Sequence, residues 1–152
     1  PLFKEVYDFS KTQGAAEETP AAINLARTYI YLKNYNEAKL LLDTSLDYAE
    51  KHPYIGLVNP SLISALKTEL LLFDEQKKYD KSLIVAKRIL DLNEKQMGQN
   101  HPQLPSTLML YADALDKVGK KKESASVRKR IRDIEMSPTE AKYLMPAEGK
   151  SK

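Results

Sequence analysis

The sequence predicts an all-α protein built as a stack of about three antiparallel helix pairs (an α-α solenoid) with flanking helices. Apolar residues recur every three or four positions along most of the 152 residues, which is helical spacing, and no persuasive strand alternation is present. The second helix of each pair also returns after 44 and then 42 residues, at Ala38, Ser82 and Ser124. Such a period is typical of solenoids, because one helix pair cannot bury its apolar face without neighbours.

The composition allows a folded domain and excludes several classes of protein. Lysine and arginine number 24 against 21 acidic residues, and 42% of the residues are hydrophobic, which is too apolar for a wholly disordered chain. Cysteine is absent, so disulfides and thiolate catalysis are excluded. Apolar runs such as Leu70 to Phe73 are far shorter than the roughly 20 residues that span a membrane. The first residues lack the apolar stretch of a secretory signal, which favours the cytoplasm.

These patterns divide the chain into three parts. Residues 1–19 carry a short apolar stripe that ends before Gly14 and predicts an N-terminal helix, either a cap or the second helix of a preceding repeat. Residues 20–136 hold the three helix pairs. Residues 137–152 are expected to form a short capping helix and a flexible tail.

The first pair is expected to begin with Thr19 as the helix cap and Pro20 in the first turn, where a missing amide hydrogen costs nothing. The segment Asn34–Asn36 interrupts the apolar pattern and separates the two helices. Their predicted buried faces consist of Ala22, Leu25, Ala26 and Tyr29, and then Ala38, Leu41, Leu42, Ser45 and Leu46.

The second pair restarts with Asn59 as cap and Pro60 behind it, and the third pair follows the interruption at residues 98–102. Turns are expected at residues 77–80 and at Gly119. The predicted buried faces consist of Leu66, Leu70, Phe73, Ser82, Val85, Ala86, Ile89 and Leu90 in the second pair, and of Leu108, Tyr111, Ala112, Leu115, Ser124, Val127, Ile131 and Ile134 in the third.

The end of the chain carries one more helix signal. Ser137 and Glu140 have the spacing of a capping box, and Ala141, Leu144 and Met145 follow them. We expect a short helix here that covers the open end of the stack, because finite solenoids need capping elements.

The three units resemble the tetratricopeptide repeat family, in the longer variety of about 42 residues found in kinesin light chains. The third unit carries the resemblance most clearly, through Gly98, His101-Pro102, Leu108, Tyr111-Ala112, Leu115, Gly119, Glu123-Ser124, Val127 and Arg130-Ile131. Several positions depart from the family pattern, among them Ser82 and Ser124, which replace alanine at the tight crossing. Glu69 stands where an apolar residue is usual, Leu70 where a small one is preferred, and Arg128 where a large apolar one is normal.

The resemblance implies a right-handed superhelical stack in which the first helix of each pair lines a concave groove. A non-catalytic scaffold that binds a peptide segment of a partner protein in this groove is the function it implies. The groove positions correspond to Ile23, Arg27, Ile30, Tyr31, Lys67, Leu71, Asp74, Met109, Asp113, Asp116 and Lys117. The sequence does not indicate which protein the partner is.

Two alternatives belong to other classes of function. Residues 117–132 are strongly basic and could contact nucleic acid through Lys120, Lys121, Lys122, Arg128, Lys129 and Arg132. Aromatic residues that stack on bases are missing from this stretch, so a nucleic-acid partner is not favoured. Self-association, as part of a longer repeat array, is the other alternative, and the sequence does not fix the oligomeric state.

No catalytic or metal site is expected. His52 and His101 each precede a proline and lie 49 positions apart, which suits loop packing better than zinc. Asp113 and Asp116 lie one helical turn apart, and carboxylates at that spacing are most often a solvated face. Glycine-rich phosphate-binding motifs and nucleophile motifs are absent from the sequence, so we predict neither an enzyme nor a cofactor.

Overall fold

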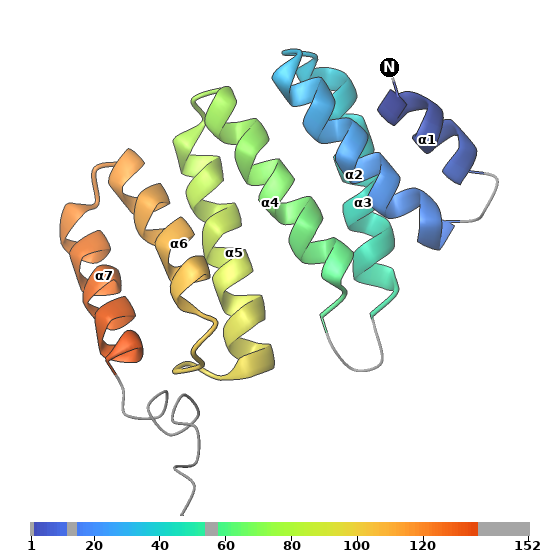
Figure 1. Cartoon of the computed structure of the whole chain (residues 1–152). Helices are drawn as coiled ribbons and strands as arrows, with labels where there is room; N and C mark the ends of the chain where they lie inside the picture. The colour runs from blue at the N-terminus through green and yellow to red at the C-terminus, as the bar shows by residue number, and fades with distance from the viewer. Residues whose placement is uncertain (1, 12–14, 54–57, 137–152) are drawn as a thin grey trace, which may run out of the picture.

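The computed structural model describes residues 2–11, 15–53 and 58–136 of the chain. These residues form seven α-helices and no strand, which run side by side through the molecule (Figure 1). The helices are α1 (Leu2–Ser10), α2 (Ala15–Tyr31), α3 (Tyr35–Lys51), α4 (Pro60–Glu75), α5 (Tyr79–Met97), α6 (Pro105–Lys117) and α7 (Lys121–Glu135).

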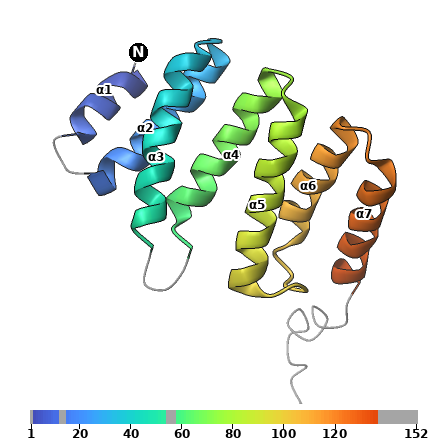
Figure 2. The ribbon, with the colours of Figure 1, turned by 180° about the vertical axis from the view of Figure 1, so that it is seen from behind.

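The helices pack as three consecutive pairs, α2 with α3, α4 with α5, and α6 with α7. Each pair also packs against the next, through α3 on α4 and α5 on α6, and the view from behind shows the same order (Figure 2). The predicted all-α stack of three helix pairs is therefore confirmed. Helix α1 packs against α2 as α3 packs against α4, so it lies where the second helix of a preceding repeat would lie.

Small residues allow the two helices of each pair to cross closely. Ala38 and Ser82 are fully buried and Ser124 is 2% exposed, each in the first turn of the second helix of its pair. Around these crossings the apolar side chains form two clusters, one from α2 to α5 and one from α5 to α7. Helix α5 contributes to both clusters, so it joins the two parts of the core.

One predicted helix start is wrong. Helix α2 begins at Ala15, and Pro20 lies inside it rather than in the first turn. The two alanines and two glutamates of residues 15–18 are good helix formers and extend the helix before the proline. Thr19 is 5% exposed and belongs to the core, so it does not cap the helix. The predicted cap at Asn59 is confirmed, since its side-chain oxygen accepts a hydrogen bond from the Ser61 N–H at 2.9 Å.

The turns within the three pairs share one backbone geometry. Lys33, Lys77 and Gly119 occupy the equivalent position and have φ values of 62°, 57° and 79°. In each turn this residue donates to the carbonyl three positions earlier, and the next residue donates to the carbonyl five positions before itself. This is the Schellman arrangement, which needs a left-handed residue and favours glycine. Two of the three turns nevertheless use lysine.

Ion pairs link the second helices of neighbouring repeats. The Arg88 guanidinium of α5 lies 2.5 Å from the Glu50 carboxylate of α3, and the Arg130 guanidinium of α7 lies 2.6 Å from the Glu94 carboxylate of α5. The two arginines are 42 residues apart and the two glutamates are 44 apart. The same contact is therefore repeated with the repeat period.

Glu69 is a buried charge between α3 and α4. It is 9% exposed, and the nearest cation is the Lys39 ammonium group, 3.7 Å from its carboxylate. Burial raises the pKa of Glu69 above its ordinary value, and nearby Asp43 adds to this, while Lys39 and Arg88 act in the opposite direction. The buried carboxylate thus destabilises the second repeat at neutral pH.

The predicted capping helix and flexible tail fall on residues 137–152, which lie outside the described residues, and the division of the chain at residues 19 and 136 stays a prediction. None of the helices in the described part is both long and apolar enough to cross a bilayer.

The left-handed turns give a first test. Replacing Lys77 by glycine should raise the free energy of unfolding by about 0.5–1 kcal/mol, because glycine adopts positive φ without a steric penalty. Gly119→Ala should lower it by a similar amount, since an added Cβ meets nothing within 4 Å and only the backbone conformation is penalised. Urea denaturation measures both changes, and a destabilised Lys77→Gly protein would contradict the assignment of these turns.

The buried carboxylate gives a second test. Because the folded-state pKa of Glu69 is raised, its contribution to stability is greatest at low pH and is lost as the pH rises through that pKa. Glu69→Leu should therefore stabilise the protein by about 1–2 kcal/mol at pH 7 and remove this part of the pH dependence. The control is Glu75→Leu at an exposed position of the same helix. Denaturation curves at several pH values that show no gain for Glu69→Leu would refute this view.

Candidate functional site

The first helices of the three pairs, α2, α4 and α6, present the residues predicted to line a groove. We call the surface that these helices form the first-helix wall. Arg27, Tyr31, Lys67, Met109, Asp113 and Lys117 are exposed on it, while Leu71, Asp74 and Asp116 are half-buried. Tyr31 is 69% exposed, which sets it apart from the tyrosines of the core.

Two of the predicted groove residues do not reach this surface. Ile23 is 2% exposed and Ile30 is 1% exposed, and both belong to the first core cluster. Helix α2 packs against α3 and also against α4, so the side of α2 nearest α4 is enclosed. The assignment of these two isoleucines to the groove is therefore wrong.

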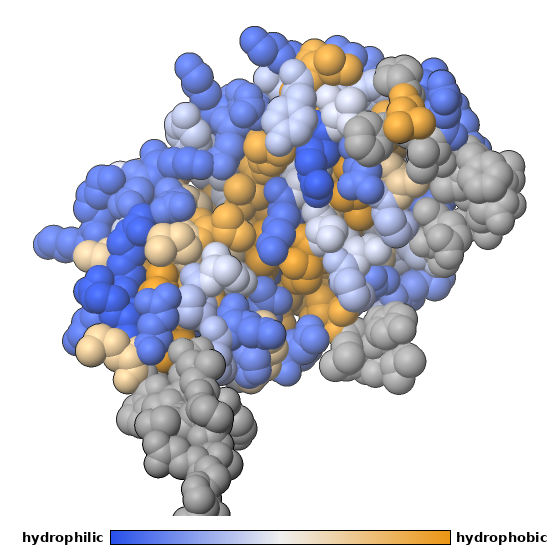
Figure 3. Space-filling model, in the orientation of Figure 1, coloured by the Kyte–Doolittle hydropathy of each residue, from blue (hydrophilic) through white to orange (hydrophobic). Residues whose placement is uncertain are grey.

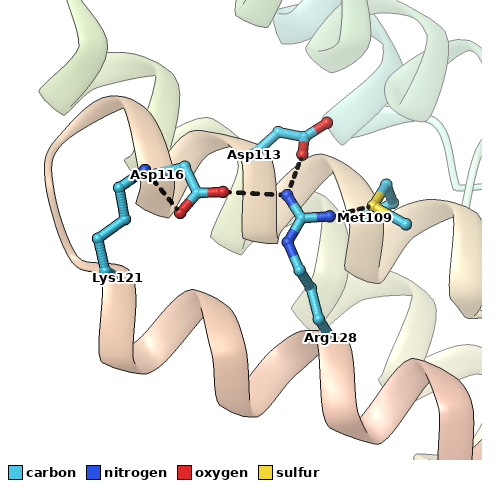
Figure 4. A network of polar contacts seen from close by, with 5 residues as sticks. All are labelled: Met109, Asp113, Asp116, Lys121 and Arg128. Atoms are coloured by element: carbon cyan, nitrogen blue, oxygen red, sulfur yellow. Dashed lines mark hydrogen bonds and ion pairs between the residues drawn. The ribbon is translucent and has the colours of Figure 1, made fainter.

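Arg128 of α7 reaches the end of the wall formed by α6. Its guanidinium lies 2.6 Å from the Asp113 carboxylate, 3.0 Å from the Asp116 carboxylate and 2.9 Å from the Met109 sulfur (Figure 4). Lys121 lies 3.2 Å from the other Asp116 oxygen. Both acids of α6 are thus neutralised by cations of α7.

The network also changes the proton affinity of its members. Hydrogen bonds from Arg128 and then Lys121 hold the pKa of Asp116 below its ordinary value. The bonds to Asp116 and Asp113 raise the pKa of Arg128 in turn. A general acid needs a raised carboxyl pKa, so the shift of Asp116 is in the wrong direction for acid catalysis at neutral pH.

A second contact joins the middle and the end of the wall. The Lys117 ammonium group of α6 lies 2.5 Å from the Asp74 carboxylate of α4. Helices α4 and α6 do not pack directly against each other, whereas α2 and α4 do. The ion pair therefore links α4 and α6, which otherwise contact each other only through α5, the helix that packs against both.

Two cations of the wall lack a carboxylate partner among the described residues, Arg27 and Lys67. Arg27 donates a hydrogen bond to the buried Thr68 hydroxyl at 3.4 Å, which places its guanidinium against α4, the helix that also carries Lys67. Tyr31 follows Arg27 by one helical turn, and Leu71 follows Lys67 in the same way. The seam between α2 and α4 therefore offers uncompensated positive charge beside apolar and aromatic surface.

The predicted basic patch is divided by the structure. Arg128 binds the acids of α6, Lys121 binds Asp116, and Lys120 lies 3.3 Å from Glu123. Lys122, Lys129 and Arg132 remain exposed without an ion pair in the described part of the chain. A nucleic-acid contact through these residues stays a prediction.

The remaining candidates for chemistry have structural roles. His52 stacks on Tyr48 with ring centroids 4.1 Å apart, and the His101 ring accepts a hydrogen bond from the Gln103 N–H at 3.2 Å. Among residues 2–11, 15–53 and 58–136, no three histidine, cysteine or acidic side chains gather in a way that could hold a metal ion.

Comparison with known proteins identifies the fold. No protein-family model matches the sequence, and no curated protein matches it either. Two crystal structures of nearly identical TPR-like repeats from a Podosopora anserina protein, named for kinesin light chain, are similar to it, with TM-scores of 0.72 and 0.70. Identity is 15% and 16%, over 93% and 95% of this chain. The match covers 66% and 67% of the solved chains, so this chain spans about two thirds of their length.

The chain has a TPR-like helical repeat fold, as its resemblance to that family implied. Proteins of this fold are typically non-catalytic scaffolds that bind other proteins. At identities of 15% and 16% the comparison supports the architecture, and the residues of the wall must carry any statement about a partner.

Proposed function

We propose that this chain is a non-catalytic adaptor that binds an extended, acidic peptide segment of a partner protein along the first-helix wall. The observation that carries the proposal is that Arg27 and Lys67, two exposed cations of the adjoining helices α2 and α4, have no carboxylate partner among the described residues. An acidic side chain of the partner would supply that missing charge. Tyr31 and Leu71 would hold an adjacent apolar side chain.

The neutral end of the wall supports the same proposal. Without Arg128 and Lys121, the carboxylates of Asp113 and Asp116 would repel an acidic segment passing over α6. Because Arg128 and Lys121 neutralise these carboxylates, the first-helix wall is positively charged between α2 and α4 and close to neutral at α6. Exposed Met109 adds an apolar contact at this end.

The strength of such binding follows from the number of contacts. Charge-assisted hydrogen bonds contribute about 1.5–3 kcal/mol each, and ordering the peptide and the long side chains offsets part of this gain. Three or four contacts therefore give a dissociation constant on the order of micromolar. This is the affinity of an exchangeable adaptor.

The proposal can be tested with Arg27→Ala combined with Lys67→Ala. Peptides selected from a random display library on the wild-type protein should be enriched in acidic residues and should bind with about micromolar affinity. The double variant should weaken them by at least about 30-fold, since two charge-assisted contacts are lost. Fluorescence anisotropy of the labelled peptides measures this change.

A matched control removes the same charge elsewhere. Lys122→Ala with Lys129→Ala changes two exposed lysines on α7, outside the first-helix wall, and should alter the affinity by less than about twofold. Selected peptides without acidic residues, or equal affinity for both double variants, would contradict the proposed site.

A further inference from the structure

The three turns within the helix pairs lie along one edge of the molecule, which we call the turn edge. In Figure 1 they follow one another along the upper border, from the α2–α3 turn to the α6–α7 turn. The ends of the helices that are joined by residues 52–59 and 98–104 lie at the opposite border. The stacking of the pairs therefore brings three segments that are distant in sequence onto one side.

Charge is distributed unequally between the two edges. The turn edge comprises residues 33–37, 77–81 and 119–123, with seven lysines against three acidic residues. The connections between the pairs, residues 52–59 and 98–104, contain no lysine, arginine, aspartate or glutamate. The last turns of α3 and α5, which precede them, carry two lysines and two glutamates, so their charges cancel: Glu50, Lys51, Glu94 and Lys95. The lysines of the turn edge are Lys33, Lys77, Lys78, Lys81, Lys120, Lys121 and Lys122, and all of them are exposed.

Most of this positive charge is not used within the molecule. Lys120 pairs with Glu123 and Lys121 with Asp116, while Lys81 lies over the Phe73 ring, 5.6 Å from its centroid. Lys33, Lys77, Lys78 and Lys122 have no ion pair among the described residues, and the two remaining acids of the edge are Glu37 and Asp80. The edge thus keeps a net positive charge directed at solvent.

The backbone shows that two of these lysines are retained against local preference. Lys33 and Lys77 adopt left-handed φ values of 62° and 57°, at the position where the third turn has Gly119. Glycine would be more stable there, so local folding stability does not explain the lysines. The presence of Lys33 and Lys77 is explained if a positive charge is required at the tips of these turns.

Three features favour an anionic lipid surface over nucleic acid as the partner of this edge. All seven cations are lysines, which act as point charges and lack the planar fork with which arginine binds a phosphate in a bidentate manner. The tyrosines of the edge, Tyr35 and Tyr79, are half-buried and so poorly placed to stack on bases. Leu32 at the tip of the first turn is 57% exposed and precedes Lys33. Figure 3 shows a small hydrophobic group among hydrophilic residues near the top of the molecule.

We propose that the turn edge docks the protein on the surface of a membrane rich in anionic lipids. Each lysine near such a surface strengthens binding about fivefold, so the four unpaired lysines together suffice for reversible attachment. In this arrangement the side chain of Leu32 enters the interfacial layer. The first-helix wall uses Arg27 and Lys67, which are not part of the edge, so a peptide and a membrane can be bound separately.

The test is sedimentation of the full chain with lipid vesicles at about 0.1 M salt. The wild-type protein should bind vesicles that contain about one third phosphatidylserine in phosphatidylcholine, and not vesicles of phosphatidylcholine alone. Lys33→Gly combined with Lys77→Gly should lower the partition coefficient about 30-fold. This variant is expected to be more stable than the wild type, so lost binding cannot result from unfolding.

The matched control is Lys95→Gln with Lys129→Gln, which removes two exposed lysines that lie outside the turn edge and also lack an ion pair among the described residues, and it should change the partition coefficient by less than about twofold. Leu32→Ser should weaken vesicle binding several-fold, because its side chain no longer enters the interface. Equal binding to neutral vesicles, unchanged binding of the glycine variant, or an equal loss in the control would overturn the proposal. Binding to a short DNA duplex without binding to the anionic vesicles would also overturn it.

Discussion

The structure depends on the burial of each helix pair against its neighbours. A single pair has an apolar face on both sides, and the close crossing at Ala38, Ser82 or Ser124 covers only the surface between its own two helices. The outer faces are covered where α3 meets α4 and where α5 meets α6. The stack is therefore the smallest unit that can exclude water from these side chains.

This constraint also determines which surfaces are free to bind. Side chains of α2 that face α4, such as Ile23 and Ile30, are enclosed, whereas the charged side chains of Arg27 and Lys67 remain exposed on the first-helix wall. At the end of the stack no further first helix packs against α7 in the described residues. There Arg128 occupies the position at which Leu42 and Ala86 are fully buried in the earlier repeats. By binding Asp113 and Asp116 it covers this end with a polar network.

Much of the fold could be predicted from the sequence, because helical periodicity and the repeat period are local properties that can be read without coordinates. The equivalent turns and the cap at Asn59 follow from the same local rules. The start of α2 could not be predicted reliably, since a proline fits both the first turn of a helix and, at some cost, a later position. Its placement depended on the helix-forming residues before Pro20.

The site was predicted only in part, because the face of a helix follows from spacing but its neighbours do not. Ile23 and Ile30 have the spacing of groove residues and are nevertheless buried by the stack. The role of Arg128 depends on contacts with residues of α6 that precede it by 12 to 19 positions in the sequence. Its one signal in the sequence was a charge at a position that is apolar in the other repeats.

Native-state hydrogen exchange, followed helix by helix, tests the central claim most directly. If each pair is stable only through its neighbours, α4 and α5 have partners on both sides and should exchange most slowly, while α1 and α7 should exchange fastest. A helix pair that keeps its protection after its neighbours have opened would contradict this account, as would faster exchange in α4 and α5 than in α1 and α7.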